Sequence, residues 1–302
     1  MKILLLGGTG QLGSEILAYN KSSNNLDINA PKKNQLDITN KNEIYKYIND
    51  HKPEIIINTA AYTDVDNAED NINICNNLNF HSLENICSVI MNKDIFLIHI
   101  STDYVFGKKE GAPFLSSDNK SPMNEYGKSK SKGEDHIINN LTKFYILRTA
   151  SLMGLRNKNF FNTIISNVKN KNPLKVIDDQ TISITWSYEL AKVIIQLCVY
   201  YPKLHQNMNS IFHVVNRGYT NWYEVSKEIE SAYYEQTKNI LGNSIIKPIS
   251  SNQWKSKAMR PNDSRLQIDE DLFKNIKIDM SHWKDAIREM VRAYLLIGDE
   301  NN

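Results

Sequence analysis

Residues 2–13 read KILLLGGTGQLG, and this stretch decides the fold. The apolar run 3–6 predicts a buried strand, and the glycines at 7, 10 and 13 follow it directly. A nucleotide diphosphate binds where the backbone comes close and where amides at a helix N-terminus point toward it. An ordinary tight turn between a strand and a helix is the alternative. In this context the spacing favours a dinucleotide-binding turn that uses Gly7, Gly10 and Gly13.

Beyond this turn, short apolar runs alternate with helical patterns. The runs cover 26–30, 55–58, 95–100 and 144–148, and the helical patterns cover 40–50, 71–91 and 124–140. Because the central runs are continuously apolar, both faces of their strands are expected to be covered. The alternation predicts an α/β fold, a Rossmann-type doubly wound parallel sheet with helices on both faces.

After residue 150 the alternation becomes irregular, which divides the chain into two regions. We expect a dinucleotide-binding Rossmann domain over 1–150, to which a segment near 186–215 returns. A smaller C-terminal α/β substrate-binding domain is expected over 151–302. In this second region Asn221, with Glu224 three residues later, predicts the start of a helix.

Composition excludes several classes of protein. The 302 residues carry 36 Lys and Arg against 34 Asp and Glu, a net charge of +2 that gives no electrostatic footprint for nucleic acid or an acidic membrane. No apolar run approaches the roughly 18 residues of a membrane span, and the apolar start is too short for a signal peptide. The 3 cysteines lack CxxC spacing, so neither a disulfide framework nor a zinc site is expected. We predict a cytoplasmic protein that acts on a small molecule.

A candidate catalytic group follows the run 95–100. Tyr126 and Lys130 are four residues apart on a predicted helix, which places them on one face, and Thr102 follows a central strand. Active sites of open parallel sheets lie at the carboxyl ends of the strands. A neighbouring ammonium is expected to lower the pKa of a tyrosine from about 10, which suits the phenol to donate a proton near neutral pH.

The end of the second strand bears on the cofactor. An NAD-preferring site usually places Asp or Glu there, whereas this chain reads Asn29-Ala30-Pro31-Lys32-Lys33. The missing carboxylate and the two lysines favour NADPH, or use of both NADPH and NADH. A solvated surface loop is an equally simple explanation of the lysines. Asp37 is expected to accept a hydrogen bond from the adenine amino group.

Several longer segments carry a family resemblance. They are the glycine turn, NTAAYTDVDNAE at 58–69, STDYVF at 101–106, Tyr126-Gly127-x-x-Lys130-x-x-Gly133-Glu134, and RPNDSRL at 260–266. Together they resemble the extended short-chain dehydrogenase/reductases and, more narrowly, the dTDP-4-dehydrorhamnose reductase family. The resemblance implies an oxidoreductase of polysaccharide biosynthesis that reduces the 4-keto group of a nucleotide-linked 6-deoxy sugar, dTDP-4-dehydro-L-rhamnose giving dTDP-L-rhamnose.

The resemblance also implies roles for individual residues. Tyr126 would protonate the carbonyl oxygen, Lys130 would hold the nicotinamide ribose, and Thr102 would bind the substrate oxygen. Cofactor contacts would come from Gly7, Gly10, Gln11, Leu12, Gly13, Asp37, Ile38, Ala61, Tyr62, Thr63, Tyr126 and Lys130. Substrate contacts would come from Thr102, Asp103, Ser151 and Arg260. Asp66 and Glu69 are interpreted as caps of a helix.

Two departures from the family pattern concern the sugar. An aromatic residue expected shortly after Arg148-Thr149 is missing, and Ser151 stands there. A glycine and a proline are also missing from residues 181–185, TISIT, which are expected to line the sugar side of the cleft. Reduction or epimerisation of another sugar nucleotide therefore stays open, as does a non-catalytic role like that of the methionine adenosyltransferase regulatory subunit. A dehydratase is disfavoured because Tyr104, not glutamate, follows Asp103.

Metal binding and assembly are less defined. Some relatives bind magnesium through carboxylates at a dimer contact, and Glu15 occupies a matching position, so magnesium and a homodimer stay open. A stabilising role of Glu15 near a helix N-terminus is favoured. The histidines lack ligand spacing, and no metal site is assigned.

Overall fold

All strands of the central sheet are parallel. The computed structural model describes residues 1–302 except 24–25, 109, 201–208, 241 and 300–302. The sheet has the order β10-β5-β4-β3-β1-β2. Its strands are β1 (Lys2–Leu6), β2 (Asp27–Asn29), β3 (Ile55–Asn58), β4 (Phe96–Thr102), β5 (Phe144–Thr149) and β10 (Asn209–His213). The predicted Rossmann-type parallel sheet is confirmed.

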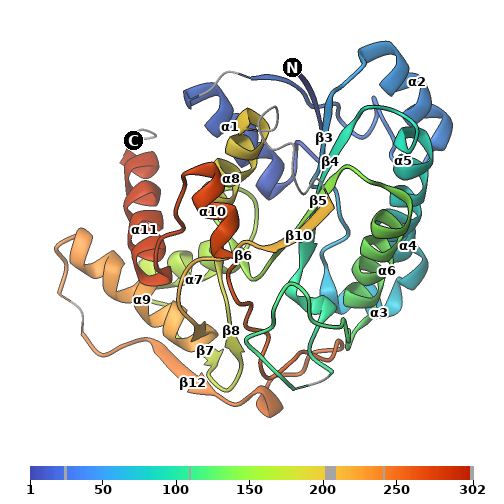
Figure 1. Cartoon of the computed structure of the whole chain (residues 1–302). Helices are drawn as coiled ribbons and strands as arrows, with labels where there is room; N and C mark the ends of the chain where they lie inside the picture. Colours follow the sequence, from blue (N-terminus) through green and yellow to red (C-terminus); the bar gives the residue numbers. More distant parts are fainter. Residues whose placement is uncertain (24–25, 109, 201–208, 241, 300–302) are drawn as a thin grey trace.

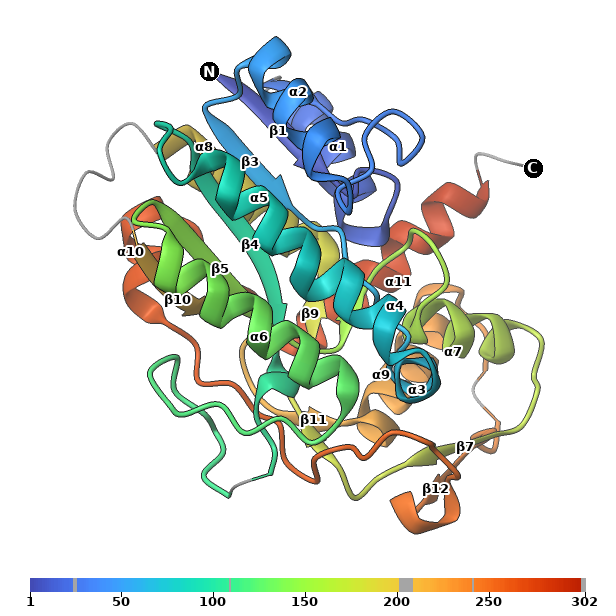
Figure 2. The same ribbon diagram turned by 90° about the vertical axis from the view of Figure 1, so that its right-hand side faces the viewer.

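Helices cover both faces of this sheet (Figure 1). One face packs against α1 (Gln11–Ser23), α8 (Ser187–Tyr200) and α10 (Glu270–Ile276). The other packs against α2 (Lys41–His51), α5 (Ser82–Ile90) and α6 (Glu125–Asn140), as Figure 2 shows. Ile55, Ile56 and Ile57 of β3 are fully buried, which explains their continuous apolar sequence.

The segment between β3 and β4 departs from one continuous helix. It contains α3 (Val65–Asp70), α4 (Ile72–Asn76) and a π-helical turn, η1 (Asn77–His81), before α5. The helix α3 is capped by Asp64, which accepts a hydrogen bond from the Asn67 amide. The expectation that Asp66 and Glu69 cap a helix is therefore wrong, because the N-cap is Asp64, and α3 begins two residues earlier than a cap at Asp66 requires.

The C-terminal elements pack at the carboxyl side of the sheet around a separate apolar cluster (Figure 2). Its helices are α7 (Phe160–Lys169), α9 (Trp222–Gln236) and α11 (Trp283–Asp299), and Asn221 caps α9 as expected. Short strands pair as β6 (Leu152–Met153) with β9 (Thr185–Trp186), β8 (Thr181–Ile182) with β11 (Thr220–Asn221), and β7 (Leu174–Ile177) with β12 (Ile246–Ile249). The described residues also form two 3-10 turns, η2 (Asp103–Val105) and η4 (Ser251–Gln253). No helix within the described ranges is long and apolar enough to cross a membrane.

Candidate active site

The glycine turn follows β1, at the point between β1 and β3 where the order in which strands are added to the sheet reverses. Gly7 has φ +81°, and a Cβ on it would lie 2.7 Å from the Ala60 amide nitrogen. A Cβ on Gly13 would lie 2.2 Å from the Gly7 carbonyl oxygen. Neither position has room for a side chain, so α1 begins tight against the turn with its first amides at the sheet edge. This geometry fits a diphosphate-binding turn.

A cavity of about 440 Å³ opens beside this turn. It is lined by the start of α1, the residues that follow β3, the ends of β4 and β5, and residues of α3, α6, β6, α7 and α9. Of the residues singled out from the sequence, its lining includes Gly10, Gln11, Leu12, Ala61, Thr63, Thr102, Asp103, Tyr126, Lys130 and Ser151. Six of the predicted site residues, all within the described part of the chain, do not line it: Gly7, Gly13, Asp37, Ile38, Tyr62 and Arg260.

Tyr126 enters the cavity from the first turn of α6. Asn124 caps this helix by accepting a hydrogen bond from the Gly127 amide. Burial raises the pKa of the Tyr126 phenol above its usual value, and a hydrogen bond with Thr102 opposes this effect. The expectation that Lys130 lowers this pKa is wrong, because burial outweighs the opposing effects and the Lys130 Nζ lies against His99 and the Ile100 carbonyl oxygen. The phenol is consequently held in its protonated form.

Lys130 is buried one helical turn further along α6. Its Nζ lies 3.1 Å from His99 Nε2 and donates a hydrogen bond of 2.7 Å to the Ile100 carbonyl oxygen. Burial lowers the pKa of Lys130 to about 8, against the opposing charges of Glu134 and Cys75. An ammonium at this position therefore exchanges its proton much nearer to neutral pH than an exposed lysine does.

Thr102 and Asp103 end β4 at the floor of the cavity. The Thr102 hydroxyl donates to Asp103 Oδ1 at 3.0 Å and accepts from the Tyr104 amide. Burial raises the pKa of Asp103 to about 6, and hydrogen bonds from Ser264 and Thr102 limit the rise. The cavity thus places a hydroxyl, a phenol and a carboxyl group around one volume.

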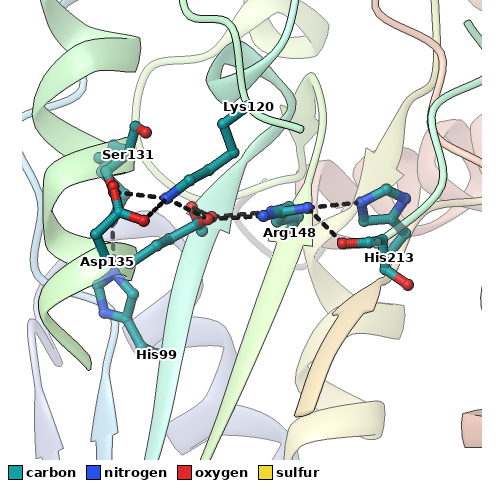
Figure 3. A network of polar contacts seen from close by, with 10 residues as sticks. His99, Lys120, Ser131, Asp135, Arg148 and His213 are labelled. Carbon is teal, nitrogen blue, oxygen red and sulfur yellow. Dashed lines mark hydrogen bonds and ion pairs between the residues drawn. The ribbon is translucent and has the colours of Figure 1, made fainter. Parts of the chain in front are cut away.

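A buried ionic network supports the helix that carries Tyr126 and Lys130 (Figure 3). Arg148 on β5 donates to both Glu134 oxygens, at 3.0 and 2.8 Å, and Ser101 donates to Oε1 at 2.5 Å. Lys120 lies 3.4 Å from Glu134 Oε2. Burial alone would raise the pKa of Glu134, but Arg148, Lys120 and Ser101 hold it below its usual value. These contacts attach α6 to β4 and β5.

Arg260 is engaged elsewhere. Its guanidinium donates to both Asp66 oxygens, at 3.0 and 2.9 Å, and lowers the pKa of that carboxyl. Arg260 also hydrogen-bonds Tyr104, which lines the cavity. Asp66 therefore anchors the segment near residue 260 to α3, and Glu69 accepts a hydrogen bond from the Glu125 amide at the start of α6.

The sugar-side expectations change in two respects. Ser151 lines the cavity with φ +43°, a backbone conformation that strains a bulky aromatic residue. Ile182 and Ile184 are buried in the C-terminal core, and no residue of 181–184 is in the described cavity lining. The segment 181–184 is therefore core structure, because its larger apolar residues replace the family's glycine and proline inside a packed cluster.

Two aromatic residues that sequence reasoning missed line the cavity instead. Trp222 begins α9 and Phe160 begins α7, with ring centroids 4.7 Å apart. Lys158 and Asn159 lie beside them in the lining. The capping residue Asn221 indicated in the sequence where α9 begins. No local pattern, however, shows that two helix starts some 60 residues apart meet at one cavity. The aromatic surface absent at position 151 thus has a counterpart from α7 and α9.

The residues after β2 have mainly local contacts. Asp37 accepts hydrogen bonds from the amide and hydroxyl of Thr39, which lower its pKa, and Ile38 packs in the core below α2. Lys32 and Lys33 are exposed.

Glu15, the residue considered for magnesium, lies on α1. Its carboxylate is 3.4 Å from Arg156, and burial raises the pKa of Glu15. Within the described part of the chain, no group of three His, Cys, Asp or Glu side chains is arranged to hold a metal.

Comparisons with known proteins agree with this geometry. The family model described as RmlD substrate binding domain matches residues 1–296. A dTDP-4-dehydrorhamnose reductase of Aggregatibacter actinomycetemcomitans is 29% identical over 295 residues, which cover 97% of this chain and 99% of that protein.

Solved structures give the same result. A dTDP-4-dehydrorhamnose reductase from Clostridium acetobutylicum has a TM-score of 0.85 and 30% identity, covering 98% of this chain and 100% of that one. A dTDP-4-dehydrorhamnose reductase from Bacillus anthracis, solved in complex with NADP, has a TM-score of 0.84 and 28% identity, covering 97% of this chain and 100% of that one. The likeness extends over the whole chain, including the C-terminal elements that close the cavity.

Proposed function

We propose that this chain, which belongs to the RmlD substrate binding domain family, is an NAD(P)H-dependent reductase of the 4-keto group of a dTDP-linked 6-deoxy sugar. The observation that carries the proposal is the convergence of Thr102, Tyr126 and Lys130 on one cavity beside the glycine turn. Dehydrorhamnose is the sugar that the relatives' names favour. A purely regulatory role would not require these three groups to meet.

The residues present fit a dinucleotide cofactor. Gly7 and Gly13 leave space that a Cβ would fill, and Gly10, Gln11 and Leu12 present the start of α1 to the cavity. We assign cofactor contacts to these residues and to Asp37, Ile38, Ala61, Tyr62 and Thr63. When bound, NAD(P)H supplies a hydride for the sugar carbonyl carbon. The exposed Lys32 and Lys33, with no carboxylate among residues 29–33 at the end of β2, favour NADPH.

The side chains then divide the acid chemistry among them. Tyr126 donates its phenolic proton to the carbonyl oxygen, and its raised pKa keeps that proton available. Thr102 orients the same oxygen from the end of β4. Lys130 holds the ribose side of the cofactor, and Asp103 and Ser151 contact the sugar. Arg260, which hydrogen-bonds Tyr104 in the cavity lining, stays a proposed substrate contact.

We also propose a division of the chain and its setting. Residues 1–150, with the return through α8 and β10, bind the cofactor, and most of 151–302 holds the substrate. Cys75, Cys87 and Cys198 are buried thiols, as expected in the reducing cytoplasm. A homodimer is the assembly that the resemblance implies, and sedimentation velocity of the purified chain tests it.

The direct test is reduction of dTDP-4-dehydro-L-rhamnose with NADH or NADPH. Consumption of the cofactor with formation of the rhamno product, identified by NMR, is the expected result. Turnover of other dTDP-4-keto sugars in competition identifies the preferred sugar. Absence of cofactor oxidation with every 4-keto sugar nucleotide would overturn the proposal.

The rate of reduction should fall as pH rises above about 8. The pKa of Lys130 is lowered to about 8, so the ammonium is present below this pH and is lost as pH rises through it. We expect kcat/KM to decrease toward tenfold per pH unit above the midpoint. The control variant Lys128→Met should keep the same pH profile. Lys128 is an exposed lysine on the same helix, where it pairs with Glu125. A flat profile to pH 10 would remove Lys130 from the reaction.

Trp222 should determine which sugar is preferred. Replacing it with leucine removes an aromatic wall of the cavity, so discrimination between 4-keto sugar nucleotides should change by about 10- to 200-fold in kcat/KM. Cofactor affinity should stay within a factor of about 3, because Trp222 is not among the residues assigned to the cofactor. Trp254→Leu is the control, since Trp254 is exposed and lies outside the cavity lining. Equal effects of the two substitutions would contradict a sugar-binding role.

A further inference from the structure

Two buried polar residues next to Lys130 have no role in the mechanism above. Asn58 ends β3 and His99 lies opposite it on β4, and each side chain is 1% exposed. Asn58 Nδ2 lies 3.3 Å from His99 Nδ1, and His99 Nε2 lies 3.1 Å from Lys130 Nζ. Figure 3 shows His99 below the ionic network of α6. With the Ala60 amide, these contacts form one continuous chain from the loop after β3 to Lys130.

The hydrogen-bond direction in this chain is set by its first member. The Ala60 amide only donates, and it donates to Asn58 Oδ1 at 3.1 Å. The Asn58 amide group therefore turns its NH₂ toward His99, whose Nδ1 must accept. A neutral imidazole that accepts at Nδ1 carries its proton on Nε2, and this N–H points at Lys130. Nε2–H faces an amine favourably and an ammonium unfavourably.

We propose that Asn58 and His99 form an oriented hydrogen-bond chain that disfavours the ammonium form of Lys130, so that Lys130 gains and loses a proton during the reaction cycle. His99 and Asn58 are positioning residues, since they act through Lys130. The proposal rests on the reductase function proposed above for this same site. It assigns to the chain from Ala60 to Lys130 the task of keeping the lysine ready to exchange protons.

The surroundings of Lys130 leave this chain room to act. In the described part of the chain, the titratable groups that act on it are His99 from β4, Cys75 from α4 and Glu134 from α6, and Tyr126 lies one helical turn away on α6. Glu134 favours the ammonium but is already paired with Arg148 and Lys120. Burial and Lys130 hold the pKa of His99 well below its usual value, so the imidazole stays neutral. The charge is therefore exchanged at Lys130 and not at His99.

Exchange at Lys130 completes the proton balance of reduction. When Tyr126 has given its proton to the carbonyl oxygen, the site must take one proton from water to restore the phenol. The ammonium of Lys130 is the source of this proton, and its loss leaves the amine that His99 Nε2–H stabilises. Solvent then restores the ammonium.

The first test reads the histidine tautomer in the cofactor-free protein. Two-bond ¹⁵N–¹H correlation NMR, with the 7 histidines labelled and the His99 signal assigned from its loss in His99→Phe, distinguishes a proton on Nε2 from one on Nδ1. A proton on Nε2 is expected. A proton on Nδ1 would overturn the proposal, whatever the protein's activity, so this result is separate from failure of the reductase assignment.

The second test inverts the chain. In Asn58→Asp the carboxylate accepts from both Ala60 and His99 Nδ1–H, which moves the imidazole acceptor to Nε2 and stabilises the ammonium. The falling limb of the pH profile should move up by roughly 1 to 3 pH units. In Asn58→Asp/His99→Phe, measured against His99→Phe, only the through-space charge remains, and the shift should be less than half as large. Equal shifts in the two backgrounds would show that His99 does not transmit the effect and would overturn the proposal.

Discussion

Replacing Tyr126 with phenylalanine is expected to lower kcat for sugar reduction by about 10²- to 10⁴-fold, the range attributed to general acid catalysis. The substitution removes only the phenolic hydroxyl, whose proton is held by a raised pKa and whose oxygen bonds Thr102. The ring packs against Tyr104 with centroids 6.0 Å apart, and this contact stays. Steady-state kinetics and calorimetric titration with NADPH measure the two effects separately.

The fold and cofactor affinity of Tyr126→Phe should be close to those of the original chain. Tyr223→Phe is the matched control, because Tyr223 is on α9 outside the cavity lining and should keep full activity. Turnover by Tyr126→Phe within a few fold of the control would show that another group protonates the sugar.

Arg148→Met is expected to destabilise the protein by about 3 to 5 kcal/mol, because it leaves a buried carboxylate without its main partner. Arg148 is 2% exposed and Glu134 is fully buried. The methionine also gives up the contact to the Ser116 carbonyl and to His213. Chemical denaturation followed by circular dichroism gives the free energy of unfolding.

The double variant Arg148→Met/Glu134→Leu separates the lost charge pair from lost packing. Removing both charges should recover much of the stability, since apolar replacement of a buried pair is often nearly neutral. A double variant as unstable as the single one would indicate that packing around β5 dominates. Stability and not activity is the readout here, because Glu134 also acts on Lys130.

The parts of the molecule set by local sequence were predictable. Three consecutive isoleucines at 55–57 require cover on both faces, and four-residue spacing alone places Tyr126 and Lys130 on one side of a helix. The glycine turn needed no knowledge of distant residues, because the steric limit at Gly13 comes from Gly7 itself.

The parts set by distant contacts were not predictable. Arg260 and Asp66 are 194 residues apart in sequence, and their ion pair depends on how the C-terminal segment crosses α3. The Tyr126 phenol was expected to have a lowered pKa from its spacing to Lys130. That expectation failed because burial raises the pKa of the phenol, while the lysine's Nζ lies against His99 on another element. Spacing on a helix shows which side chains are neighbours but not which partner each one chooses.

The π-helical turn η1 places a structural demand on chain length. Asn79 in this turn accepts a hydrogen bond from the Tyr62 amide and donates to Ser129 Oγ, so it connects the loop after β3 to α6. A π-turn holds one residue more than an α-turn, and each residue turns a helix by about 100°. Deleting one residue here would let the helix relax to regular winding and rotate Asn79 away from both partners. The connection therefore depends on the number of residues between Tyr62 and Asn79 as much as on the identity of Asn79.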